Sequence, residues 1–195
     1  MRLSILIALL LTVAGCAGVD PDRLKALPED TLFSVALPEF ASIQPDYRRQ
    51  VSDNVVTERM GYRPHPGQGF ALFTYVMGPP GTFAPSPFDE NQAPAALEAA
   101  IRSDSLLKGR ALSIESKGKA ANVYGTAHWI SFRMSGYTCA AIGQSFDDRA
   151  GLHGFLCSPD SGGEVYTESR IRETVEGIVR RPNKEADAML SRSGG

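Results

Sequence analysis

The second half of the chain alternates short apolar stretches with turn signals. The apolar stretches lie at residues 111–116, 122–134, 137–146 and 152–157. Turn signals separate them at Gly118, at Ser135-Gly136 and at 147–151. Connections this short join neighbouring strands that run in opposite directions. The pattern therefore predicts an antiparallel β-sheet.

The first half adds further strands and an open loop. Residues 31–37 alternate in part, and residues 70–77 are rich in aromatic and β-branched side chains, so we expect a strand at each. Val55-Val56 is expected to begin another strand, whereas the polar stretch 44–54 is ambiguous. The proline-rich stretch 78–87 is expected to be an exposed loop, with a proline-rich ligand for a partner's groove as the alternative.

Two segments carry apolar side chains at helical spacing. The segment 91–108 has Leu97 and Ile101 on one side, and the segment 165–176 repeats this spacing with Ile171. A sheet that is apolar on one face needs a cover on that face. We therefore expect an α+β fold, in which an antiparallel sheet has two main helices packed on one face.

The N-terminus has the pattern of an export signal. Met1-Arg2 is a short basic start, and the run 3–14 is apolar apart from Ser4 and Thr12. This run is too short to cross a hydrocarbon core, which needs roughly 20 residues. The alternative, an N-terminal core helix, would need polar residues at helical spacing.

Val13-Ala14-Gly15-Cys16 resembles the lipobox of bacterial lipoproteins. The resemblance implies a diacylglycerol thioether on Cys16, cleavage after Gly15, and an acyl chain such as palmitate on the new amino terminus. Two or more acyl chains give a stable anchor, whereas one binds reversibly. Ala17 replaces the aspartate that marks inner-membrane lipoproteins, which favours the outer membrane. The alternative is an ordinary signal peptide in which Cys16 is incidental.

These features divide the chain into four parts. We expect a lipoprotein signal peptide at 1–15, a lipidated tether at 16–30, a single periplasmic domain at 31–180 and a flexible tail at 181–195. The formal net charge is −2 and no basic patch stands out, so we expect no nucleic-acid partner. The lipid on Cys16 is then the expected contact with the membrane.

Cysteine usage agrees with export. With Cys16 lipidated, Cys139 and Cys157 remain, and an oxidising compartment makes a disulfide the expected state. If the hairpin loop is centred on Asp148, these two cysteines lie directly opposite each other, at about 4.5–5.5 Å between Cα atoms. A disulfide tolerates that separation. A metal pair is the alternative, although the close Cys/His spacing of zinc sites is missing.

The catalytic motifs that we weighed are incomplete. His65, His128 and His153 do not form a His-Glu-x-x-His pattern. Residues 143–147 begin like a nucleophile elbow, but Asp147 stands where the closing glycine belongs. We therefore assign no catalytic residue, no metal ligand and no cofactor, and we expect a protein that is not an enzyme.

Two weaker arrangements remain as alternatives. Ser145, His153 and Asp148 form a conceivable trio across the hairpin, although we expect Asp148 at a mobile tip. Asp147-Asp148 and Asp89-Glu90 offer oxygen ligands for calcium, but two adjacent aspartates at a tip are more often a solvated turn. We expect His128 on the solvent face of its strand.

Four aromatic residues form a candidate binding face, and core packing is the alternative. They are Tyr124, Trp129, Phe132 and Tyr137. The strand pattern places Trp129 and Tyr137 on one side and Phe132 on the other. Aromatic side chains in strands also pack sheet cores, so the same residues fit the second interpretation.

The stretch 129–157, with its two cysteine-bearing strands and the helix that follows, resembles uncharacterised small proteobacterial lipoproteins. The resemblance covers roughly the last third of the chain and implies no activity. We therefore expect a membrane-anchored envelope lipoprotein with a non-catalytic binding or support role. Its partner would be another envelope protein or a ligand. The alternatives are a cell-envelope hydrolase and a lipoprotein that binds a small apolar or glycan ligand.

Overall fold

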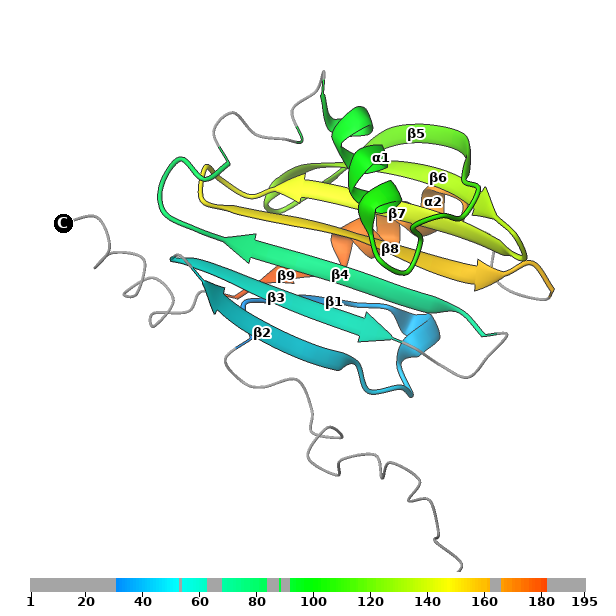
Figure 1. Ribbon diagram of the computed structural model, residues 1–195, viewed down its shortest axis with the longest axis horizontal. Helices are drawn as coiled ribbons and strands as arrows, with labels where there is room; N and C mark the ends of the chain where they lie inside the picture. Colours follow the sequence, from blue (N-terminus) through cyan, green and yellow to red (C-terminus); the bar gives the residue numbers. More distant parts are fainter. Residues whose placement is uncertain are drawn as a thin grey trace, which may run out of the picture.

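The computed structural model describes residues 31–52, 54–62, 68–83, 88, 92–161 and 166–181. Nine strands, two α-helices and one 3₁₀ helix lie within these residues (Figure 1). In chain order they are β1 Phe33–Val35, η2 Pro38–Phe40, β2 Asp46–Ser52, β3 Val55–Tyr62, β4 Phe70–Met77, α1 Ala93–Ser103, β5 Ser113–Asn122, β6 Gly125–Met134, β7 Tyr137–Ser145, β8 Ala150–Pro159, α2 Glu168–Glu176 and β9 Ile178–Arg180.

Seven strands form one antiparallel sheet in the order β2-β3-β4-β8-β7-β6-β5. Two meanders, β2 to β4 and β5 to β8, meet where β4 pairs with β8. The short strands β1 and β9 form a separate antiparallel pair. In Figure 1 this pair and α2 lie behind the large sheet, and α1 lies in front of it.

The fold is mostly β, so the expected α+β class is wrong. The expected helices are present but short, and they lie on opposite faces instead of one. Leu97 and Ile101 of α1 pack into one core, whereas Ile171 and Val175 of α2 pack into the other. The reason lies in β7, where every residue from 138 to 144 is buried. A strand without a polar side needs cover on both faces, as the two apolar layers provide.

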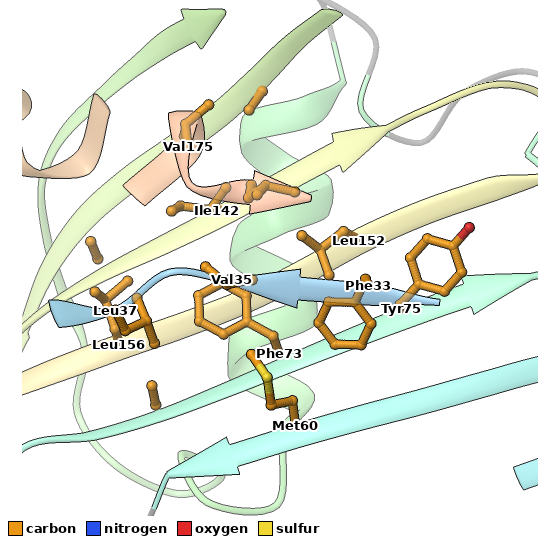
Figure 2. Packing of buried hydrophobic residues seen from close by; sticks show 14 of the residues in the cluster. Phe33, Val35, Leu37, Met60, Phe73, Tyr75, Ile142, Leu152, Leu156 and Val175 are labelled. Atoms are coloured by element: carbon orange, nitrogen blue, oxygen red, sulfur yellow. The ribbon is translucent and has the colours of Figure 1, made fainter. Parts of the chain in front are cut away.

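The larger core lies between the sheet and the layer made by β1, β9 and α2 (Figure 2). Phe33 of β1 stacks on Tyr75 of β4, with ring centroids 5.6 Å apart. Phe73, Leu152 and Leu156 of the sheet point into the same layer. The short β1 and β9 therefore cover the part of this face that α2 leaves open.

The strand β4 has the bounds that the sequence predicts, but β5 does not. Gly118, expected in a turn, lies within β5 and opposite Trp129 of β6. A Cβ atom at Gly118 would lie 2.3 Å from Trp129 Cζ2. The glycine is therefore required for close approach of the indole ring, and the turn comes later, between Asn122 and Gly125.

The disulfide between Cys139 and Cys157 is confirmed, as is its hairpin register. The two cysteines lie directly opposite each other in β7 and β8, with 4.1 Å between their Cα atoms. Ala141 lies opposite Phe155, as the loop centre at Asp148 predicts. Both cysteines are fully buried in the core beneath α1. Closing this loop stabilises the fold by about 3 kcal/mol in the chain-entropy model.

Glu58 of β3 is a fully buried carboxylate in the larger core. Its Oε1 accepts hydrogen bonds from Arg49 Nε at 2.8 Å and Nη2 at 2.5 Å. Its Oε2 accepts the backbone N–H of Leu32 at 2.8 Å. The Leu32 carbonyl in turn accepts the N–H of Arg181 at 2.7 Å. Glu58 thus fastens the chain ahead of β1 to the sheet.

Replacing Gly154 by alanine should destabilise the protein. A Cβ atom there would lie 2.4 Å from Phe73 Cδ1 and 2.6 Å from the Leu72 carbonyl oxygen. Overpacking of this kind costs about 1–3 kcal/mol, so the free energy of unfolding in urea should fall by that amount for Gly154→Ala. Gly61→Ala is the matched control, because its nearest atom would be Leu72 Cδ1 at 3.4 Å. The control should be no less stable than the wild type. Equal losses in both variants would contradict the packing.

Candidate functional site

A surface hollow lies beside the C-terminal end of α1. It has a volume of about 60 Å³ and is lined by Asp46, Arg48, Arg59, Gly61, Leu72 and Ser105. Strands β2, β3 and β4 form its floor, and the segment after α1 forms its wall. Pockets for drug-sized ligands measure roughly 300–1,000 Å³. The hollow therefore suits a small group on a larger partner better than a whole ligand.

Two arginines dominate the hollow. Arg48 of β2 lies directly opposite Arg59 of β3, so both side chains leave the same face of the sheet. Arg48 Nη2 lies 3.2 Å from Asp46 Oδ2, and Arg59 Nη2 lies 3.3 Å from Asp104 Oδ2. Their side chains stay 68% and 46% exposed. A guanidinium offers a planar fork of donors that matches a carboxylate or phosphate. The pair can therefore recognise an oxyanion.

Asp104 connects this hollow to the core. It follows α1, and its Oδ1 accepts the backbone N–H of Leu106 at 2.8 Å. This bond shapes the turn that delivers the buried Leu107 to the core beneath α1. The other carboxylate oxygen is the one that pairs with Arg59. Asp104 therefore has a structural role and also orients one of the two arginines.

His153 lies in a second, smaller hollow of about 10 Å³, which Thr74 and Asp104 also line. Burial lowers the pKa of His153 below its ordinary value; the Asp104 carboxylate opposes this shift and Arg59 adds to it. Among the described residues, no hydrogen bond joins His153 to Asp104 or to Thr74. A histidine that acts as a general base needs such a partner to orient it. The neutral imidazole is instead part of the packing beneath α1.

The structure places one of the other two histidines, His128, inside the sheet. His128 is buried, at 3% exposure, so the expectation that it faces solvent is wrong. It lies opposite Gly143 of β7, and His153 lies opposite the same glycine from the other side. The Phe88 ring covers that glycine, since a Cβ atom there would lie 2.7 Å from Phe88 Cε1. His65 lies outside the described residues.

The aspartates of the β7–β8 hairpin each contact another segment of the chain, which the sequence did not predict. Asp147 Oδ2 pairs with Arg180 Nη1 at 2.7 Å. Asp148 Oδ2 accepts the N–H of Gly81 at 3.0 Å, which ties the hairpin to the segment after β4. The trio with Ser145 and His153 is therefore not assembled, because Asp148 is engaged elsewhere.

The calcium alternative gains no support from the fold. Asp89 and Glu90 lie outside the described residues, as does Cys16. In the described part of the chain, no three His, Cys, Asp or Glu side chains gather as metal ligands would.

The helices of the described residues are short compared with a membrane span. Neither α1 nor α2 is long and apolar enough to cross a membrane.

The four aromatic residues do not form one surface. Trp129 is buried in the core beneath α2, whereas Phe132 is buried beneath α1 with Tyr137 packed beside it. Tyr137 thus shares a side with Phe132 and not with Trp129, contrary to the strand pattern. Tyr124 is half-buried, and its hydroxyl accepts the Arg180 N–H at 3.1 Å and donates to the Arg180 carbonyl at 3.2 Å. These contacts fit core packing.

The arginine pair was not foreseen from the sequence. Its members come together because β2 and β3 form a hairpin, and the stretch that holds β2 is ambiguous in its polar pattern. Asn54, at the turn, has a positive φ of 62°. Asparagine tolerates that conformation better than most residues. An asparagine between a polar run and Val55-Val56 is the signal that would have found the hairpin.

The chain matches no protein-family model, and a search of curated proteins gives no match.

The depressed pKa of His153 predicts that stability falls on mild acidification. Below pH about 6.5 the unfolded chain binds a proton at His153 that the folded chain does not bind. The free energy of unfolding should therefore drop as the pH falls below about 6.5, by at most about 1.4 kcal/mol per pH unit from this group. Urea unfolding of the wild type and of His153→Gln should show a shallower drop in the variant. Parallel pH profiles would contradict the assignment.

Proposed function

We propose that the chain is an envelope lipoprotein, anchored through lipid on Cys16, whose folded domain binds a partner without catalysis. The observation that carries the proposal is Val13-Ala14-Gly15-Cys16 after a short basic and apolar start. The buried disulfide of the domain supports it, because disulfides persist in oxidising compartments outside the cytoplasm. Ala17 after the cysteine supports the outer membrane, with the domain facing the periplasm.

The geometry of the tether is compatible with an anchored domain. The described domain starts at Thr31, so residues 17–30 connect it to Cys16. A chain of that length spans at most roughly 50 Å when fully extended. The domain would therefore work close to the membrane surface, and its partner would be found there.

The hollow at Arg48 and Arg59 is the site that we assign to the partner. It presents two guanidiniums from neighbouring strands, and the hairpin register places the Cα atoms of Arg48 and Arg59 opposite each other. An acidic group on another envelope molecule could pair with both. The hollow does not suit a hydrolase, because no described side chain orients His153 beside it by a hydrogen bond, and the free volume around His153 is only about 10 Å³. It does not suit a glycan platform either, because Trp129 and Phe132 are buried.

The anchor predicts the chemistry of the mature N-terminus. Mass spectrometry of the protein from membranes should find a chain that starts at Cys16 with the mass of a diacylglycerol and an added acyl chain. Cys16→Ala should leave the membrane fraction or remain unprocessed. The double variant Cys139→Ala, Cys157→Ala is the control, since it removes two sulfurs and should keep the lipid. An unmodified Cys16, or an intact Met1, would contradict the anchor.

The non-catalytic role is tested with the same strains. Where deletion of the chain causes a phenotype, His153→Gln should restore the wild type, whereas Cys16→Ala and Arg59→Glu should not. A His153→Gln protein that is folded and normally abundant, yet fails as completely as the deletion, would overturn the non-catalytic proposal.

A further inference from the structure

Three exposed apolar side chains lie at one end of the molecule, spread between the two edge strands of the large sheet and β9. Among the described residues, the exposed large hydrophobic side chains are Val51 at 48%, Val123 at 90% and Val179 at 44%. Val51 is the next-to-last residue of β2, Val123 lies in the β5–β6 turn, and Val179 lies in β9. Most isolated apolar residues on a surface need no explanation. The position of these three valines at the same end of the sheet does need an explanation.

The strand register places all three valines at the same end of the sheet. Val51 lies opposite Val56, which lies opposite Met77, and Met77 lies opposite Ala150 in the β7–β8 hairpin. That hairpin contacts β9 through the Asp147–Arg180 ion pair. It also contacts the β5–β6 turn, because the rings of Phe146 and Tyr124 pack in a T-shaped arrangement with their centroids 5.5 Å apart. Figure 1 shows the β5–β6 and β7–β8 hairpins and the tips of β2 and β4 at this end.

The N-terminal segment joins the domain at this same end. Phe33 of β1 lies opposite Arg180 of β9, and the Leu32 carbonyl accepts the Arg181 N–H. The 30 residues that precede Thr31 therefore enter beside Val179 and the β7–β8 hairpin. On the proposed function these residues carry the lipid, so the end with the exposed valines is the one tethered toward the membrane.

The charges at this end are mixed. The basic residues Arg149, Arg180 and Arg181 lie near the acidic residues Asp147, Asp148 and Glu176, the last of which follows the Val175 whose carbonyl accepts Asn122 Nδ2. Asp147 is neutralised by Arg180, and Arg181 is exposed beside Thr31. Arginine close to a bilayer surface interacts with lipid phosphates, while apolar side chains enter the boundary between headgroups and acyl chains.

We propose that this end of the domain rests on the bilayer that holds the lipid anchor, with Val123 at the tip of the β5–β6 turn inserted among the headgroups. The inference rests on the proposed function, because the anchor keeps the domain near the surface. Three valines give too little apolar area for stable binding on their own, so the contact orients an anchored domain. The face with Arg48 and Arg59 is then left free to meet a partner.

Tryptophan fluorescence tests the orientation directly. Trp129 is the one tryptophan of the chain and is buried, so a second tryptophan reports on its own position. The full chain with Val123→Trp is purified from membranes and reconstituted into vesicles of phosphatidylethanolamine and phosphatidylglycerol, with or without brominated acyl chains. Ser135→Trp is the matched control, because Ser135 lies in the exposed β6–β7 turn at the opposite end of the sheet.

The brominated lipid should quench the added emission of Val123→Trp at least about twofold and leave that of Ser135→Trp unchanged, given the shallow depth of an interfacial residue. If both variants float with the vesicles but neither is quenched by bromine, the orientation is overturned while the anchor stands. Equal quenching of both by aqueous acrylamide would likewise overturn it and leave this end open to a protein partner. If the chain does not float with vesicles, the proposed anchor fails and the orientation fails with it.

Discussion

The buried carboxylate of Glu58 determines how the N-terminal segment meets the sheet. It has no exposed surface and is held by Arg49 on one oxygen and by the Leu32 amide on the other. Removing one partner of a buried ion pair typically costs about 3–5 kcal/mol, because the other charge is left uncompensated. With Leu32 fixed, β1 lies across the large core and pairs with β9. The carboxylate thus helps to fasten the layer that covers Phe73 and Tyr75, together with the β1–β9 pairing and the stack of Phe33 on Tyr75.

The parts of the fold that could be predicted are those with local signals. The strand at 70–77 and the hairpin between Cys139 and Cys157 follow from composition, turn residues and the constraint of two opposed cysteines. The opposite placement of the helices was missed, although β7 carries the signal. Its run of small and apolar residues has no polar side, which indicates a strand covered on both faces. Gly118 was misjudged because a glycine that admits an indole ring resembles a turn glycine in sequence.

The candidate site could not be predicted, because it depends on register and not on a motif. Arg48 and Arg59 meet only through the β2–β3 hairpin, and Asp104 reaches Arg59 across 45 positions of the chain. The histidines and aromatic residues drew attention because of their chemistry, yet most of them fill the cores. The missed arginine pair and the buried histidines and aromatic residues have the same cause. Residue type indicates which chemistry a side chain can perform, whereas the pairing of neighbouring strands determines whether that side chain is exposed.

In the proposed function, a lipidated tether holds the domain at the membrane and the hollow with Arg48 and Arg59 meets a partner. Hydrogen exchange at the Leu32 amide tests most directly whether Glu58 fastens the start of the domain. This amide should exchange as slowly as the amides of β3, and Glu58→Ala should speed its exchange while β7 stays protected. Rapid exchange of Leu32 in the wild type, or no change in the variant, would contradict this role of Glu58.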